Sequence, residues 1–96
     1  MTAEHGSAVA VVTAGEVEGA LAGFLAERTG VPVGAGEDLF ASGLVSSMFA
    51  MQLVVHLEEA YGIAIVGPEL KLENFRSVGA MARLVMRLRD ASGEGQ

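Results

Sequence analysis

The sequence predicts an all-α fold: a small four-helix bundle of three main helices and one short helix, with a long loop between helices one and two. The chain has 96 residues, the size of one domain. Hydrophobic residues make up 51% of it, with four Phe, one Tyr and no Trp. A core built from Leu, Val, Met and Ala favours packed helices over a β-sandwich. Apolar residues also recur at helical spacing in three segments.

The first helix is expected over residues 15–29. Thr13 and Glu16 have the spacing of a capping box, in which each side chain accepts a hydrogen bond from the other residue's backbone. Gly30 and Pro32 end the helical pattern. The inward face of this helix is predicted to hold Val17, Leu21, Phe24 and Leu25.

A long loop and the second helix follow. Residues 33–43 are predicted to form the loop, and the large apolar side chains of Leu39 and Phe40 are expected to anchor it to the core. The second helix is expected over residues 47–61, because Gly62 stands where a helix C-cap favours glycine.

The last third of the chain is predicted to form a linker, a short helix and a long helix. Ile63–Val66 is short, apolar and β-branched, which indicates an extended, buried linker. Pro68 then opens a short helical turn over residues 68–73, and Ser77 caps the last helix. Its inward residues are expected to be Val78, Met81, Leu84, Val85 and Leu88. Its C-terminus, where positive charge suits the dipole, is expected to hold Arg83, Arg87 and Arg89.

The ends of the chain lack these patterns. We therefore expect a flexible N-terminal tail over residues 1–12, one folded domain over residues 13–91 and a flexible C-terminal tail over residues 92–96.

Composition excludes several classes of function. The net charge is −6, and ten of the 12 acidic residues precede Arg76, which disfavours nucleic acid and favours basic protein partners. The chain has no cysteine, and His5 and His56 have no neighbouring ligands, so no metal site is predicted. No apolar run reaches the roughly 18 residues of a membrane helix, and the N-terminus lacks the basic flank of a signal peptide. We expect a cytoplasmic monomer with no membrane partner.

Two serines stand where the second helix begins. Gly43 allows a tight turn before them, and Ser46 can cap the helix through its hydroxyl. The hydroxyl of Ser47 is then free in the first turn. A phosphodiester on it would lie beside unpaired N–H groups and the positive end of the helix dipole. Serines at helix starts are also common as plain caps, and from these residues alone that interpretation stays open.

The wider segment resembles a known attachment motif. Gly43-Leu44-Val45-Ser46-Ser47-Met48 is similar to the attachment site of phosphopantetheine carrier proteins, whose usual form is Leu-Gly-x-Asp-Ser-Leu. Three other stretches resemble the same family: Asp38-Leu39-Phe40, Leu57-Glu58-Glu59-Ala60-Tyr61-Gly62-Ile63 and Leu72-Glu73-Asn74-Phe75-Arg76-Ser77-Val78. The resemblance implies that residues 13–91 are a carrier domain with a covalent 4'-phosphopantetheine arm on a serine.

The resemblance leaves two candidates for the serine that carries the arm, Ser46 and Ser47. Counting from Gly43 in the commonest form of the motif points to Ser46, whereas counting back from the end of the second helix points to Ser47. The segment also resembles the Gly-Leu-Leu-Asp-Ser-Met form of D-alanyl carrier proteins, including the later Gln52-Leu53, and this ungapped alignment favours Ser47. Ser46 then replaces the family's Asp. Both can cap a helix, but the lost carboxylate calls loading by a generic transferase into question.

No nucleophile, base and orienting acid stand together in the sequence, so we expect a carrier and not an enzyme. The arm's thiol would hold the cargo as a thioester. Among carriers, the chain resembles discrete proteins that hold glycerate-derived or methoxymalonyl-type units in polyketide and antibiotic biosynthesis. A D-alanyl or other aminoacyl carrier and an unmodified helical adaptor are the alternatives. Expected partners are a phosphopantetheinyl transferase, acyl-loading and tailoring enzymes, and a polyketide synthase acyltransferase.

The second helix has two predicted faces. Helical spacing turns Ala50, Leu53, Val54, Leu57 and Tyr61 toward the core, with Phe49 at the core's edge. The opposite side is predicted to be a partner-docking surface with Ser47 at its border, formed by Met48, Met51, Val55, Glu58 and Glu59. The resemblance also implies that this helix recognises partners. The alternative is that the three apolar residues of this side pack under neighbouring loops.

Overall fold

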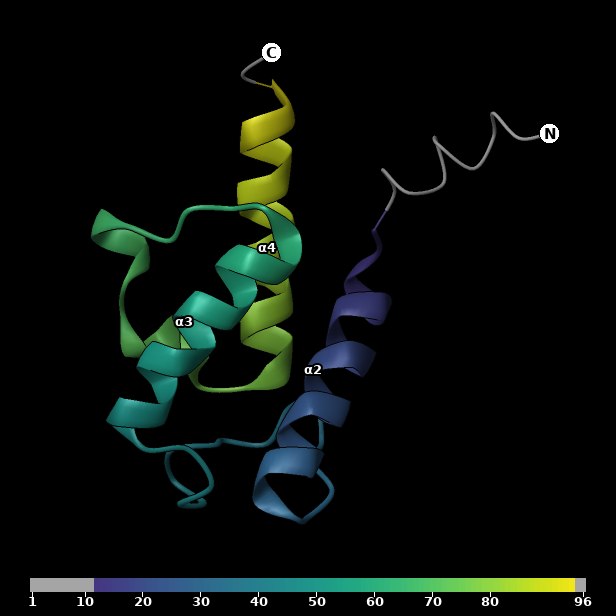
Figure 1. Cartoon of the computed structure of the whole chain (residues 1–96), viewed down its shortest axis with the longest axis vertical. Helices are drawn as coiled ribbons and strands as arrows, with labels where there is room; N and C mark the ends of the chain where they lie inside the picture. The colour runs from purple at the N-terminus through teal and green to yellow at the C-terminus, as the bar shows by residue number, and fades with distance from the viewer. Residues whose placement is uncertain (1–11, 95–96) are drawn as a thin grey trace, which may run out of the picture.

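The computed structural model describes residues 12–94, with side chains as far as residue 90, and every regular element in this range is helical. The predicted all-α fold is therefore confirmed. The elements are α2 (Ala14–Thr29), α3 (Ser47–Tyr61), the short 3-10 helices η1 (Gly67–Glu69) and η2 (Leu72–Phe75), and α4 (Val78–Glu94). Figure 1 shows α3 crossing in front of α4, while α2 packs chiefly against α4.

The helix boundaries follow from caps in the local sequence. At the start of α2, the Thr13 hydroxyl accepts a hydrogen bond from the Glu16 N–H at 3.1 Å, and the Glu16 carboxylate accepts one from the Thr13 N–H at 3.0 Å. The predicted capping box is therefore present. Gly30 ends α2 and Gly62 ends α3, each in the left-handed conformation with φ of 79° and 63°. Before α4, the Ser77 hydroxyl accepts a hydrogen bond from the Ala80 N–H at 3.0 Å, so the predicted cap is confirmed.

The predicted tails differ in what the structure describes. Residues 1–11 of the predicted N-terminal tail lie outside the described residues, and only Val12 belongs to them, partly buried against the core. The helical backbone of α4 continues to Glu94, inside the stretch 92–96 that the sequence assigned to the other tail. No proline follows Val78 to stop the helix earlier.

The core is apolar and joins all three main helices. No polar or charged residue is buried among the described residues. The largest fully buried side chains are Leu21, Leu25, Leu39, Leu53, Leu57, Ile65, Met81 and Leu84. Five residues that were predicted to pack on the core or at its edge contact it while partly exposed: Phe24, Phe40, Phe49, Tyr61 and Leu88.

The long loop is fastened to the start of α4. Leu39 is fully buried, as predicted, and its N–H donates to the carbonyl of Arg76 at 2.7 Å. Its own carbonyl accepts a hydrogen bond from the Val45 N–H at 3.1 Å. The Asp38 carboxylate accepts hydrogen bonds from the N–H groups of Phe40 at 3.1 Å and Ala41 at 3.0 Å. These bonds fix the direction in which the chain enters α3.

The connecting segment, residues 62–77, departs from the prediction in two ways. Ile63 and Ile65 are buried, but the side chains between and after them are exposed, because an extended chain alternates its side chains between two sides. The single short helix predicted over residues 68–73 is wrong. Leu70, with φ −83° and ψ 75°, leaves the helical region and Lys71 is extended, so η1 and η2 are separate turns.

The arginines of α4 do not serve the end of their own helix, as the sequence predicted. Because α4 continues to Glu94, its last turn holds no basic residue. Arg87 instead forms an ion pair with Glu69 of η1, with 2.8 Å between Nη2 and Oε1. Arg89 donates a hydrogen bond to the carbonyl of Tyr61 at 3.1 Å, which places its charge at the C-terminus of α3.

Candidate functional site

The two serines at the start of α3 have different surroundings. Ser46 is the N-cap, and its Oγ accepts a hydrogen bond from the N–H of Phe49 at 3.1 Å. Ser47 is the first helical residue, and its exposed hydroxyl makes no hydrogen bond within the described part of the chain. The Ser46 hydroxyl is therefore engaged in capping α3, whereas the Ser47 hydroxyl is not bonded within the described part of the chain.

The N-terminus of α3 suits an anion attached to Ser47. The N–H groups of Ser47 and Met48 have no partner among residues 12–94, because the first helical N–H groups have no acceptor in their own helix. No acidic residue stands in the first turn of α3. A phosphodiester on the Ser47 hydroxyl would meet two donors and the positive end of the helix dipole. The residues present therefore fit a phosphate-linked group.

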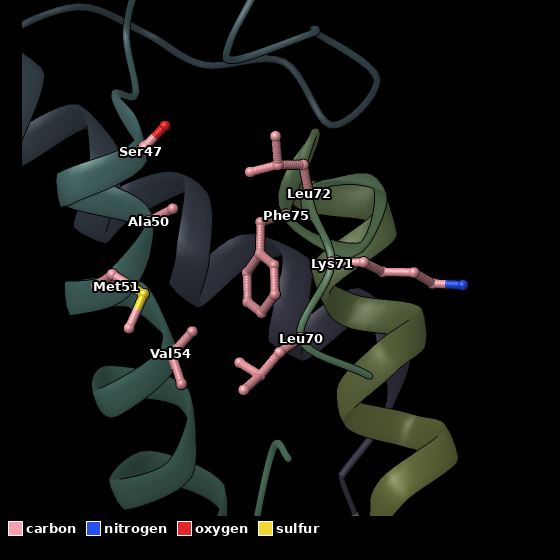
Figure 2. Close-up of a pocket in the computed structure, with 8 residues that line it drawn as sticks. All are labelled: Ser47, Ala50, Met51, Val54, Leu70, Lys71, Leu72 and Phe75. Carbon is pink, nitrogen blue, oxygen red and sulfur yellow. The ribbon is translucent and has the colours of Figure 1, made fainter. Parts of the chain in front are cut away.

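A cavity of about 290 Å³ lies beside Ser47, between α3 and the connecting segment. Figure 2 shows the α3 side chains facing the connecting segment across this space, while the side chain of Lys71 points away from it. The lining residues are Ser47, Ala50, Met51 and Val54 from α3, and Leu70, Lys71, Leu72 and Phe75 from the connecting segment. The surface that encloses the cavity is almost entirely apolar.

The predicted docking residues differ in their surroundings. Met48, Met51 and Val55 are 77%, 61% and 51% exposed, so they do not pack under neighbouring loops. At about 100° per residue, however, Met51 and Glu58 lie close to Ser47 in angle, and Met51 lines the cavity. Only Met48, Val55 and Glu59 point directly away from the core. The predicted surface therefore divides into a flank that faces the connecting segment and an outward face.

Glu58 has a structural bond that the sequence did not indicate. Its side chain is partly buried, and its carboxylate accepts a hydrogen bond from the N–H of Ile65 at 2.8 Å. Glu59 is exposed. Of the two adjacent acids, only Glu59 is therefore a simple surface charge.

The side of the cavity formed by the connecting segment was not predicted from the sequence. Leu70 and Leu72 were assigned to a short helical turn, and Phe75 was not singled out as a site residue. The usable signal was that two large apolar residues, Leu70 and Leu72, stand two positions apart without a helical partner. In the structure they are 48% and 54% exposed.

The histidine in the described part of the chain contacts an aromatic ring. The rings of His56 and Phe24 stack with their centroids 4.0 Å apart, which joins α3 to α2. The Arg28 guanidinium lies 4.5 Å from the centroid of the same Phe24 ring. His5 lies outside the described residues, and among those described no group of three or more His, Cys, Asp or Glu could hold a metal ion.

No helix in residues 12–94 is both long enough and apolar enough to cross a membrane.

Comparison with known proteins finds a match to a family model. The model of the phosphopantetheine attachment site matches residues 19–85, which is more than half of the chain. No individual curated protein matches the chain significantly. The matched range contains α3, the long loop and the connecting segment. The chain therefore belongs to the family of carrier proteins that have a phosphopantetheine attachment site.

Proposed function

We propose that Ser47 carries the arm and that this protein presents acyl thioesters to successive enzymes. Members of the family are non-catalytic carriers with covalently attached 4'-phosphopantetheine, and they interact with a phosphopantetheinyl transferase and acyl-handling enzymes. The observation that carries the choice of serine is the contrast at the start of α3. The Ser46 hydroxyl is engaged as the cap, whereas the Ser47 hydroxyl is exposed and unbonded within the described chain.

The chemistry at this site is divided between the chain and the arm. In the proposed loading step the Ser47 hydroxyl oxygen would attack the phosphorus of coenzyme A that bears the pantetheine. The pyrophosphate P–O bond would break, adenosine 3',5'-bisphosphate would leave, and the serine would give up its proton. The N–H groups of Ser47 and Met48 would be the donors available to the phosphate oxygens. When bound, the arm supplies a terminal thiol on which an acyl group is held as a thioester.

We propose a glycerate-derived or methoxymalonyl-type unit as the cargo, in polyketide or antibiotic biosynthesis in the cytoplasm. The support is the resemblance of Gly43-Leu44-Val45-Ser46-Ser47-Met48 to carriers of that type. The cavity beside Ser47 is almost entirely apolar, so it offers a hydroxylated unit few hydrogen-bond partners. We therefore expect such a cargo to stay in solvent and to remain available to enzymes. A D-alanyl carrier is the second candidate, on the similarity of the same segment to that family.

We also propose that partner enzymes dock on the outward side of α3. The support is the exposure of Met48 and Val55, which are large apolar side chains close to the arm. Glu59 adds an exposed acid to the same side. A polyketide synthase acyltransferase and acyl-loading and tailoring enzymes are the partners that the proposed cargo implies.

The attachment site is tested by loading two serine variants. The apo protein is incubated with coenzyme A and a broad-specificity phosphopantetheinyl transferase, and the adduct is mapped by mass spectrometry. Ser47→Ala should stay unmodified. Ser46→Asp is the matched control, because aspartate keeps the helix cap but removes the competing hydroxyl. This control should gain the mass of one phosphopantetheine. An adduct on Ser46, or none with any transferase, would refute the assignment.

The cargo is tested on the holo protein. We expect a glyceryl thioester when a phosphatase-like glyceryl-loading enzyme and an activated three-carbon phosphoglycerate are supplied. Efficient charging by a D-alanine-activating enzyme instead would support the second candidate.

A further inference from the structure

The outer wall of the cavity, residues 70–72, contains no buried residue. Its three side chains are exposed, whereas Ile65 before it and Phe75 after it are only 2% and 3% exposed. The wall therefore spans the distance between two buried anchors. Because few apolar contacts hold it, such a stretch can open locally without unfolding of the core.

The backbone hydrogen bonds around the wall are local. The N–H of Leu70 donates to the carbonyl of Gly67 at 3.0 Å, the N–H of Lys71 to Glu69 at 3.0 Å, and the N–H of Asn74 to Lys71 at 3.0 Å. All these partners belong to the connecting segment. The bonds shape its turns, but they do not tie the wall to a main helix.

Glu69 makes that tie. Its carboxylate pairs with Arg87 of α4 at 2.8 Å, and within the described chain no other side-chain hydrogen bond joins residues 66–74 to a main helix. Its carbonyl also accepts a hydrogen bond from the side-chain amide of Asn74 at 2.8 Å. Glu69 thus links η1, η2 and α4. The side chains of Arg87 and Glu69 are 52% and 31% exposed, so the pair is open to solvent and salt.

We infer that Glu69 and Arg87 are positioning residues, whose ion pair holds the outer wall in place and thereby sets access to the cavity beside Ser47. The inference rests on the proposed function in giving this cavity its importance, since the arm leaves α3 from Ser47. The effect of the ion pair on the wall does not depend on the arm, so it can be measured on the chain alone. Breaking the pair leaves the wall held by its local turns, so the residues opposite it become easier to reach.

A single introduced cysteine measures this access, because the chain contains no cysteine. Val54 lines the cavity on the α3 side and is 9% exposed. The full-length Val54→Cys protein is reacted with iodoacetamide under native conditions, and the rate is followed by intact mass. Adding Glu69→Gln or Arg87→Gln should raise the rate about two- to five-fold, the factor expected for a solvent-exposed ion pair. Both substitutions together should act no more strongly than one, because they remove the same interaction.

Three controls separate this effect from general loosening. Glu73→Gln on the connecting segment and Arg83→Gln on α4 remove the same charges from exposed residues that have no ion pair in the described chain, so they should leave the rate unchanged. Val17→Cys in α2 is fully buried away from the cavity, and its labelling reports unfolding of the core. High salt should reduce the difference in labelling rate at position 54 between the protein with the Glu69–Arg87 ion pair and the variants without it.

Two results would overturn the inference. One is an unchanged labelling rate at position 54 when the pair is broken. The other is an equal rise at positions 54 and 17, which would mean that the pair only stabilises the whole fold. Neither result bears on the loading of Ser47, which is measured separately by its phosphopantetheine adduct.

Discussion

The carboxylate of Glu58 accepts a hydrogen bond from the backbone N–H of Ile65 at 2.8 Å, across seven residues of sequence. The backbone carbonyl of Glu58 also accepts hydrogen bonds from Gly62 at 3.0 Å and Ile63 at 3.3 Å. One residue thus closes the last turn of α3 and directs the chain into the buried part of the connecting segment. An acid that the sequence assigned to partner docking therefore also has a structural function.

Removing this carboxylate should destabilise the fold. We expect Glu58→Ala to lower the free energy of unfolding by about 1–3 kcal/mol, because it leaves a partly buried N–H without its charged partner. Glu59→Ala is the matched control, and as a surface substitution it should change stability by no more than about 0.5 kcal/mol. Urea denaturation followed by circular dichroism measures both. Equal effects of the two variants would show that the Glu58 bond contributes nothing particular.

The cap at Ser46 gives a second prediction. Ser46→Ala should cost about 1 kcal/mol of stability, because the Phe49 N–H loses its acceptor. Ser46→Asp should be at least as stable as the natural protein, since an aspartate also caps the helix and its charge suits the dipole. Thermal unfolding of the three proteins at one pH ranks them. A Ser46→Ala protein as stable as the natural one would contradict the capping role.

The parts of the fold that could be predicted from sequence are those set by neighbouring residues. Thr13 and Glu16 mark the start of α2 because a capping box needs only three residues of separation. Ser46 and Gly62 mark the two ends of α3 in the same way. The predicted range of the second helix, residues 47–61, is the observed one.

The cavity could not be predicted because its two walls are far apart in sequence. Val54 looked like an ordinary core residue, and nothing local places Leu70 across the cavity from it (Figure 2). The wall is positioned by Glu69 and Arg87, which are 18 residues apart. An ion pair at such a separation leaves no periodic signal. The helical pattern likewise located Met51 on the solvent side of α3, but it could not show that the connecting segment comes beside it.

Glycines in α2 give a third prediction. Gly19 is exposed in the middle of the helix, and beyond its chain neighbours and the backbone of its own helix no heavy atom lies within 4 Å of where a Cβ would be. Gly19→Ala should therefore stabilise the protein by about 0.5–1 kcal/mol, because alanine loses less backbone freedom on folding. Gly30→Ala is the contrast, since φ of 79° strains an alanine and should cost about 1 kcal/mol. Chemical denaturation measures the free energy of unfolding of both variants. A Gly19→Ala protein less stable than the natural one would contradict the exposed position of Gly19 in α2.

Docking on the outward face of α3 gives two further predictions, one on affinity and one on the association rate. Met48 and Val55 are exposed by 77% and 51%, and neither lines the cavity. Met48→Ala or Val55→Ala should weaken binding to a cognate loading enzyme by about 1 kcal/mol or more, since apolar anchors that lose water supply most of an interface's affinity. Titration calorimetry with the holo protein measures the affinity.

The charge of Glu59 on the same face should affect the rate of association with a partner more than the affinity. Glu59→Lys should slow association with a basic partner, and the slowing should be greatest at low ionic strength, where screening is weak. Stopped-flow mixing at two salt concentrations measures the association rate.

Leu53→Ala is the folding control for the docking variants. Leu53 is fully buried on the opposite side of the same helix, and its truncation should cost about 2–5 kcal/mol of stability. If Met48→Ala and Val55→Ala bind the loading enzyme as tightly as the natural protein while remaining folded, the partner approaches Ser47 from another side. The flank formed by Met51 and the wall of the cavity would then be the next surface to test, because it also borders the serine.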